Sequence, residues 1–314
     1  MLNKKISVVI PCYNEAKNIE ELYQRLSLVL KSTIQNYELI FVDNKSIDTS
    51  REIFKNLAKQ DKKLIAIFFS RNFGHSQYGF TAGTDYATGD AVVWLEGDLQ
   101  DPPELISEFI RKWQEGYDVV YGIRTRRRGN IFWRAAYKIF YVIFRKLASM
   151  NIPRDAGDFS LLDRRVVDVL NAMPERDRYM RGLRAWAGFK STGVNYVRAA
   201  RAGGKTSNNL VKNIKWAKKA IFSFSYAPVE FIFWLALSVF LVSIFAIIFY
   251  LVSYFVTGAP QGFTTTLLAT LFLGSVQLLS LSIIAEYISR IFEEVKGRPK
   301  YVIEEIINDS RKTS

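Results

Sequence analysis

Cysteine and histidine are nearly absent from this chain, which has one of each among 314 residues. A lone Cys12 excludes an internal disulfide and argues against a metal site built from cysteines, a usage typical of proteins in a reducing compartment. The first 14 residues contain one short apolar run before Pro11 and then become polar. We therefore expect no cleavable signal peptide and a first domain that stays in the cytosol.

Charged residues are absent from two long stretches, 231–256 and 263–285. Each exceeds the roughly 20 helical residues that cross a bilayer, and this length disfavours two buried core helices. The linker 257–262 contains turn residues and no charge, so two transmembrane helices within 227–292 should form a hairpin. Basic flanks on both outer sides predict a multi-pass protein of the inner (plasma) membrane, with the N-terminal domain and the tail 293–314 in the cytosol. These flanking residues are Lys212, Lys215, Lys218, Lys219, Arg290, Lys296, Arg298 and Lys300.

An excess of lysine and arginine gives the chain a formal net charge of +13. Nucleic acid, anionic lipid and phosphorylated substrates would all suit such an excess. Because the C-terminal third is apolar, we favour membrane lipids and phosphates and expect no nucleic-acid partner. Residues 131–150 and 208–224 mix aromatic and basic side chains, which is typical of helices at the membrane interface; surface helices packed on the domain are the alternative. Gly274 and Ser275 would let apolar helices pack closely in a homo-oligomer.

The first 125 residues alternate short β-branched runs with amphipathic segments. This alternation predicts an α/β fold with a doubly wound parallel sheet covered on both faces, in a cytosolic domain spanning 1–222. The expected strands are 6–10, 38–42, 64–69, 91–95 and 119–121, and the expected helices are 18–32, 49–59, 76–87 and 102–114.

Ligands of such sheets bind at the carboxyl ends of the strands, so the loops after the strands hold the candidate site. Those loops read PCYNE, DNKS, SRNFG, EGDLQDPP and GIR in chain order. Carboxylates for a divalent cation and guanidinium groups for the remaining charge are what a metal-bridged diphosphate requires. The loops supply both.

A series of sequence motifs extends over nearly the whole chain. In chain order the motifs are SVVIPCYNE, VDNKS, SRNFG, GDLQDPPE and GDFSLLDRR, followed by the apolar stretches and EYISRIFEEVKGRP. In this order the series resembles the GT-A glycosyltransferases of family 2, and among them the polyprenyl-phosphate glycosyltransferases, such as dolichyl-phosphate mannose synthases and undecaprenyl-phosphate glucosyltransferases. The resemblance implies a Rossmann-like GT-A domain with amphipathic interface helices and a two-helix transmembrane hairpin. It also implies inverting transfer of one sugar from a nucleotide diphosphate sugar to polyprenyl (undecaprenyl) phosphate at the cytosolic membrane face, for cell-envelope polysaccharide modification.

The resemblance further implies roles for individual residues. Mg²⁺ or Mn²⁺ would be held by Glu96, Asp98 and Gln100, and the catalytic residues would be Asp98 and Asp158. Asp158 would act as a base or as an orienting group, with a helix N-cap before residues 159–169 as the structural alternative. The donor would be bound by Pro11, Tyr13, Glu15, Asp43, Glu96 and Arg124, and the acceptor phosphate by Arg126, Arg201 and Lys205.

Three positions depart from the pattern of that family. Glu96 replaces the first aspartate of Asp-x-Asp, Asn44 stands where a second aspartate is common, and Lys205 precedes the hydroxyl residue that it usually follows. Because of these changes, one alternative is that the protein is a catalytically inactive membrane scaffold for a partner transferase or flippase. A processive polysaccharide synthase is the other alternative, although two spans cannot readily enclose a polymer and RGLRAW at 181–186 only partly resembles its Gln-x-x-Arg-Trp element. A UDP-hexose, especially UDP-glucose, is the favoured donor, before GDP-mannose and UDP-N-acetylhexosamine.

Overall fold

The computed structural model describes residues 2–125, 156–176, 178–198, 225, 227–257, 262–309 and 311. The predicted interface helices, 131–150 and 208–224, lie outside the described residues, as do Arg126, Arg201 and Lys205. The described part divides into two compact units. One is a sheet domain, to which the residues from Arg298 onward also belong, and the other contains two long apolar helices.

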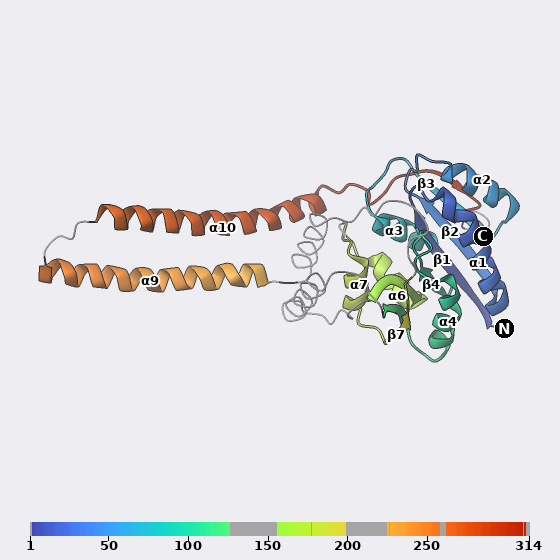
Figure 1. Cartoon of the computed structure of the whole chain (residues 1–314), viewed down its shortest axis with the longest axis horizontal. Coiled ribbons are helices and arrows are strands. Elements are labelled where there is room, and N and C mark those ends of the chain that lie inside the picture. Colours follow the sequence, from blue (N-terminus) through green and yellow to red (C-terminus); the bar gives the residue numbers. More distant parts are fainter. Residues whose placement is uncertain are drawn as a thin grey trace. The chain divides into compact units, whose positions relative to one another are not determined.

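The sheet domain (Figure 1) is built on a mixed eight-stranded sheet. The strand order is β7-β5-β6-β4-β1-β2-β3-β8. Strands β1 to β4 run parallel to one another and β5 is parallel to β7, whereas β6 and β8 are antiparallel to their neighbours. The strands are β1 (Leu2–Cys12), β2 (Ile34–Asp43), β3 (Leu64–Phe69), β4 (Ala91–Trp94), β5 (Val119–Arg124), β6 (Ala156–Asp163), β7 (Ser191–Tyr196) and β8 (Ile303–Ile307).

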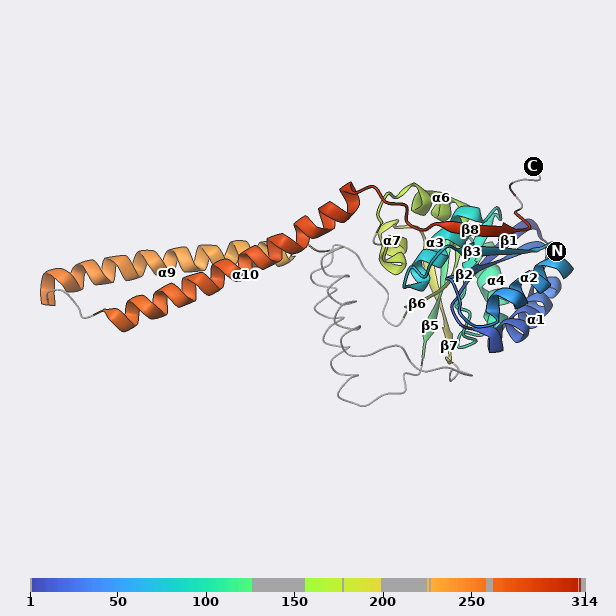
Figure 2. The same ribbon diagram turned by 90° about the horizontal axis from the view of Figure 1, so that it is seen from above.

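Helices cover both faces of this sheet (Figure 2). Helices α1, α2 and α4 form one layer, and α3, α6 and α7 form the other. Apolar residues spaced three or four apart explain the packing, since α1 buries Ile19, Leu22 and Leu26 along one face. The helices are α1 (Ala16–Thr33), α2 (Ser50–Gln60), α3 (Ser76–Tyr86), the 3-10 turn η1 (Pro103–Leu105), α4 (Ile106–Gln114), α6 (Arg164–Ala172) and α7 (Met180–Trp186).

The predicted α/β class and the alternation over the first 125 residues are confirmed, and the five strands predicted there run in one direction. The sheet as a whole is mixed, because the antiparallel strands β6 and β8 were not predicted. Strand β6 inserts antiparallel between β4 and β5. The alternative of a helix capped near Asp158 is wrong, because Phe159 lies fully buried within β6. Helix α6 begins only at Arg164, where the side chain of Asp163 accepts the amide hydrogen of Arg165 and serves as the cap.

The C-terminal residues add β8 to the edge of β3, where the sequence had predicted only a tail. Ile303 pairs with Phe69, and the ring of Tyr301 stacks on that of Phe69 with centroids 5.5 Å apart. At the far end of the strand, the side chain of Asn308 donates to the carbonyl of Ala58 at 2.6 Å. The strand thus covers an edge of the sheet that would otherwise present unpaired peptide groups.

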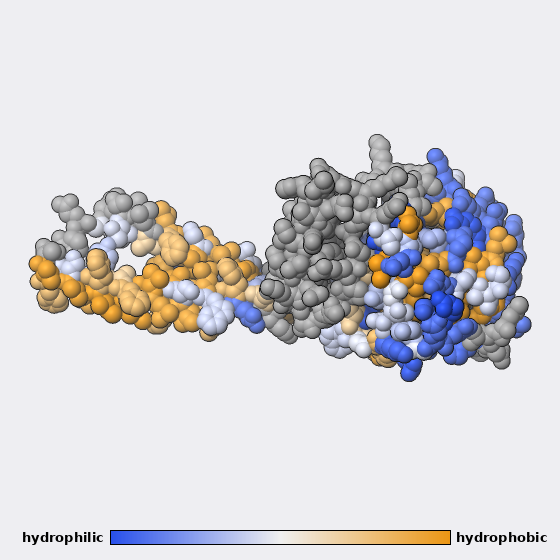
Figure 3. Space-filling model, turned by 60° about the horizontal axis from the view of Figure 1, so that its bottom comes forward, coloured by the Kyte–Doolittle hydropathy of each residue, from blue (hydrophilic) through white to orange (hydrophobic). Residues whose placement is uncertain are grey.

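Two long helices, α9 (Ala227–Thr257) and α10 (Phe263–Val295), form the second unit. The candidate spans Ala227–Val256 and Ala269–Val295 have mean hydropathies of 2.8 and 1.7, and no part of their apolar windows is buried inside the protein. Figure 3 shows apolar residues along both helices. Both are therefore long and apolar enough to cross a membrane, which indicates membrane association.

A buried carboxylate ties the amino-terminal edge of the sheet together. Glu38 of β2 accepts hydrogen bonds from the Ser7 hydroxyl at 2.6 Å and the Thr88 amide at 2.8 Å, and it lies 2.6 Å from the Lys5 ammonium. Burial raises the pKa of Glu38, but these partners together lower it below its ordinary value. The ionised carboxylate therefore stabilises the fold above its unfolded pKa of about 4.3, and this stabilisation is lost as the pH falls through the lower folded pKa.

Replacing Glu38 with glutamine should lower the free energy of unfolding by about 1–3 kcal/mol at pH 7, because the neutral amide no longer pairs with the Lys5 ammonium and turns a donor toward it. Thermal unfolding of the purified chain measures this loss, which should shrink as the pH falls below about 4. Glu108→Gln, at a partly exposed position on α4, is the control and should change stability by less than about 0.5 kcal/mol. Equal stability of Glu38→Gln and the unmodified chain at pH 7 would contradict the role given to this carboxylate.

Candidate active site

The carboxyl ends of the parallel strands meet at one edge of the sheet. Cys12 at the end of β1 pairs with Asp43 at the end of β2, so the loops that follow these strands are neighbours. The start of β6 lies at the same edge, because Trp94 at the end of β4 pairs with Ser160. The acidic loop after β4 and the segment around residue 158 are thereby brought together.

Hydrogen bonds join the loops after β1 and β2. The Asn14 amide donates to the Ser46 hydroxyl at 2.9 Å, and the Asn14 side-chain oxygen accepts the Ile47 amide hydrogen at 2.9 Å. Both oxygens of Asp43 accept from the Ser46 amide, at 3.1 and 3.3 Å, and burial raises the pKa of this carboxyl group. Tyr13, the residue before Asn14, is 42% exposed and is open to a ligand.

Pro11 and Glu15, two further predicted donor residues, are buried. Glu15 accepts a hydrogen bond from the Asn18 side chain at 2.5 Å, which fixes the start of α1. Pro11 packs against α3, and a Cβ added at Gly79 would lie 2.5 Å from the Pro11 Cβ. Helix α3 can approach β1 this closely only because residue 79 is glycine. Both residues support the neighbouring loops, and their contact with a donor stays a prediction.

Asn44 connects the loop after β2 to the loop after β3. Its side-chain oxygen accepts the Phe73 amide hydrogen at 2.9 Å, and its side-chain nitrogen donates to the Asn72 oxygen at 3.3 Å. The same Asn72 oxygen accepts the Gly74 amide hydrogen at 2.7 Å. An aspartate at position 44 has no hydrogen to donate to Asn72. The departure from the expected aspartate therefore has a structural reason in this chain.

The loop after β4 concentrates negative charge. Glu96 accepts a hydrogen bond from the Ser76 hydroxyl at 2.9 Å, and Asp98 accepts the Gln100 amide hydrogen at 3.1 Å. Burial, followed by the charges of Asp158 and Asp98, raises the pKa of Glu96 to about 8. Positive charge at this loop is consequently favourable.

Two arginines bind this acidic loop through a carboxylate that the sequence patterns did not single out. Asp101 is fully buried and accepts a hydrogen bond from the Tyr196 hydroxyl. Arg198 lies 3.1 Å from Asp101 and 3.7 Å from Asp98. Arg124 lies 3.6 Å from Asp101 and donates to the Tyr196 hydroxyl at 3.1 Å. The predicted Asp98 and Arg124 thus share one ion-pair cluster, to which the fold adds three residues that sequence reasoning missed.

Asp158 is buried at the start of β6, and Arg181 of α7 holds both of its oxygens. The two hydrogen bonds measure 2.9 and 2.7 Å. Burial would raise the pKa of Asp158, but the charges of Arg181, Arg184 and Arg124 lower it below its ordinary value. Arg184 donates to the Gly157 carbonyl at 3.2 Å, and burial lowers its pKa to about 10. Asp158 is therefore an ionised, paired carboxylate, which suits an orienting group better than a base.

A family model described as glycosyl transferase family 2 matches residues 7–170, more than half of the chain. The chain belongs to glycosyltransferase family 2. It is 41% identical to the uncharacterized glycosyltransferase YkcC of Bacillus subtilis, over 95% of this chain and 93% of the relative. It is 36% identical to the SfII prophage-derived bactoprenol glucosyl transferase of Shigella flexneri, over 95% and 97%. It is 35% identical to the prophage bactoprenol glucosyl transferase homolog of Escherichia coli K12, over 96% and 99%.

This glycosyltransferase has the GT-A fold that the resemblance implied, with its doubly wound sheet and two C-terminal apolar helices. Among solved structures, glucosyl-3-phosphoglycerate synthase of Mycobacterium tuberculosis, in complex with Mn²⁺, UDP-glucose and phosphoglyceric acid, is 18% identical to it. That comparison has a TM-score of 0.49 and covers 70% of this chain and 79% of the other.

The acidic loop of this glycosyltransferase fits a divalent cation that is shared with a substrate. Within the described ranges, no three His, Cys, Asp or Glu side chains form a group that could hold an ion by themselves. Mg²⁺ is usually held by one or two carboxylates together with substrate phosphates and water, so a complete protein cage is not needed. Glu96 and Asp98 provide two such carboxylates, and burial together with the nearby charges of Asp158 and Asp98, which a cation would offset, raises the pKa of Glu96.

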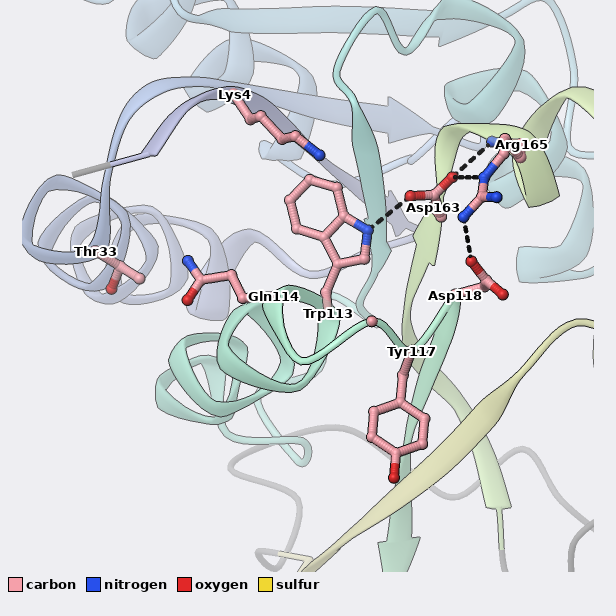
Figure 4. Close-up of a pocket in the computed structure, with 9 residues that line it drawn as sticks. Lys4, Thr33, Trp113, Gln114, Tyr117, Asp118, Asp163 and Arg165 are labelled. Carbon is pink, nitrogen blue, oxygen red and sulfur yellow. Dashed lines mark hydrogen bonds and ion pairs between the residues drawn. The ribbon is translucent and has the colours of Figure 1, made fainter.

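A cavity of about 720 Å³ lies elsewhere, at the amino-terminal edge of the sheet (Figure 4). Its charged groups pair with one another. The indole of Trp113 donates to Asp163 at 2.8 Å, and Arg165 bridges Asp163 and Asp118 at 3.1 and 2.5 Å. Lys4 lies 4.5 Å from the centre of the Trp113 ring. None of the predicted site residues lines this cavity, so the active-site candidate is the carboxyl edge of the sheet.

The role of Asn44 can be tested with a pair of matched substitutions. Asn44→Asp should lower the free energy of unfolding by about 1–2 kcal/mol, because two acceptor oxygens then face each other where a hydrogen bond was. Asn72→Asp keeps an acceptor for both the Asn44 side chain and the Gly74 amide and should stay within about 0.5 kcal/mol of the original chain. Thermal unfolding of the three proteins at pH 7 gives the order of their stabilities. A larger loss of stability in Asn72→Asp than in Asn44→Asp would refute this account.

Proposed function

We propose that this glycosyltransferase transfers one sugar, a hexose such as glucose, from a nucleotide diphosphate sugar to polyprenyl (undecaprenyl) phosphate at the cytosolic face of the membrane. The observation that carries the proposal is the cluster of carboxylates and arginines at the carboxyl edge of the sheet, in a chain with two helices of membrane-spanning length. Relatives that are 35–36% identical over almost their whole length are named bactoprenol glucosyl transferases. Their names support a polyprenyl acceptor and a glucosyl donor here.

On the donor side, Asp43 and Tyr13 would bind the nucleotide, and Glu96, Asp98 and Gln100 would hold Mg²⁺ or Mn²⁺ beside the diphosphate. The bound cation supplies positive charge that stabilises the leaving diphosphate.

Arg124 and Arg198 would contribute further positive charge at the donor diphosphate. Both guanidinium groups are held by the buried Asp101, at 3.6 and 3.1 Å. Because they are fixed before the substrate binds, little reorganisation accompanies the development of charge on the leaving group.

On the acceptor side, the chemistry does not require a general base. The second pKa of a phosphate monoester is about 6, so the attacking oxygen is already largely ionised at neutral pH. Asp158 would then orient Arg181 toward the acceptor or the sugar, and Arg126, Arg201 and Lys205 would bind the acceptor phosphate. Attack from the face opposite the leaving diphosphate would invert the anomeric carbon.

The two alternative functions receive less support. An inactive scaffold has no use for a carboxylate whose pKa is raised to about 8 beside a network of fixed arginines, which is the pattern of a working site. The segment RGLRAW, which partly resembles a synthase element, contributes Arg181 and Arg184 to contacts with Asp158 and Gly157. These contacts give the segment a role within the domain that needs no polymer channel.

The proposed function can be tested with purified protein, Mg²⁺ or Mn²⁺, undecaprenyl phosphate and a panel of labelled nucleotide sugars. We expect a lipid that carries a single sugar, detected by mass spectrometry of the organic extract. Asp98→Ala should reduce the rate at least 100-fold, because it removes a group that would hold the cation at the developing charge. Glu108→Gln serves as the active control. Absence of product with every donor, while native membranes make it, would favour the scaffold, and a product longer than one sugar would favour the synthase.

Asp158→Asn should lower kcat by roughly 10- to 100-fold, because the amide cannot hold Arg181 through two charge-assisted hydrogen bonds. The rise of kcat with pH around 6 should persist in this variant, since it belongs to the acceptor phosphate. The pH profiles of the two proteins, measured from pH 5 to 8, decide the question. Loss of that rise in Asp158→Asn would show that the carboxylate acts as a base.

A further inference from the structure

The C-terminal strand β8 contacts the loop that follows β2. Glu304 lies 2.7 Å from the Lys45 ammonium and 3.0 Å from the guanidinium of Arg51. Lys45 follows Asp43 and Asn44, the residues that shape this part of the candidate site. A carboxylate 259 positions further along the chain thus binds the loop assigned to the nucleotide.

Strand β8 is a firm support for this contact. The Ser70 amide donates to the Val302 carbonyl at 3.0 Å, and the Tyr301 hydroxyl donates to Asp85 at 2.8 Å. Burial and the charge of Asp85 raise the pKa of Tyr301, so its hydroxyl keeps the proton that this bond needs. Together with pairing to β3, these contacts fix the backbone from which Glu304 extends.

Lys45 has a backbone conformation that benefits from an external contact. Its φ is 60°, in the left-handed region that costs free energy for a residue with a side chain. The ion pair with Glu304 offsets part of that cost. The side chains of Lys45 and Glu304 are 40% and 42% exposed, so the effect should be moderate and sensitive to salt.

We propose that Glu304 is a positioning residue of the donor site, which holds Lys45 and thereby keeps the loop of residues 43–46 in the conformation that binds the nucleotide. The contact itself is independent of the activity. The consequence for donor binding rests on the proposed function, in which Asp43 of this loop binds the nucleotide.

Glu305, the next residue of β8, provides a matched control. It also pairs with two cations, Arg51 at 3.0 Å and Lys55 at 2.7 Å. Both of these belong to α2 and not to the loop. Substitution of Glu305 therefore removes the same charge from the same strand while leaving Lys45 with its partner.

The test combines hydrogen exchange with kinetics on the full chain. Glu304→Gln should accelerate amide exchange in residues 44–47 and raise the KM for the sugar donor, each by about two- to fivefold, with kcat changed less than twofold. Glu305→Gln should change exchange and KM by less than twofold. Lys45→Gln combined with Glu304→Gln should raise KM no further than the more affected single variant, because both remove one contact.

Unchanged loop exchange in Glu304→Gln, or an equal effect of Glu305→Gln, would overturn the proposal. Faster exchange with an unchanged KM would overturn it as well, and would count against the donor role of Asp43. If the unmodified chain transfers no sugar, the proposed function fails, while the exchange rates still decide whether Glu304 holds the loop.

Discussion

Charge balance at the carboxyl edge of the sheet constrains the rest of the catalytic domain. Carboxylates and guanidinium groups taken out of water destabilise a fold unless each meets a partner, because the protein interior solvates ions poorly. At this edge the partners come from distant elements, so the elements must meet for any of the charges to be tolerated. The insertion of β6 between β4 and β5 is what brings Asp158 beside the acidic loop and within reach of α7. The charged residues are Glu96, Asp98, Asp101, Asp158, Arg124, Arg181, Arg184 and Arg198.

The same balance gives two neighbouring carboxylates opposite properties. Glu96 has a hydroxyl partner and lies among other carboxylates, which together with burial raise its pKa to about 8. Asp158 is buried, yet three guanidinium charges lower its pKa. When the environments of two neighbouring acids shift their pKa values in opposite directions, the two acids usually have different roles in one reaction. Here they separate a group suited to a cation from a group that organises arginines.

Strong periodicity made most of the fold predictable from the sequence, and the order of polar loops made the location of the site predictable. Helix α1 buries the residues that its spacing selects, and Asp43 and Glu96 lie where parallel strands end. Strands β6 and β8 were not predicted because they lie outside the alternation of strands and helices in the first 125 residues. The partners of the site were equally hidden, since Asp101 and Arg198 are 97 residues apart and no local pattern relates them.

Two arginines on α7 stabilise the ionised state of Asp158. Arg181 and Arg184 are three residues apart, so they share a helix face. Arg181 binds the carboxylate directly, and Arg184 is buried near it against the ring of Tyr121, at 5.4 Å. Burial lowers the pKa of Arg184, which means that its charge destabilises the domain unless an anion is close. A protonated Asp158 would leave both cations without that anion, so the fold itself favours the ionised carboxylate and opposes uptake of a proton.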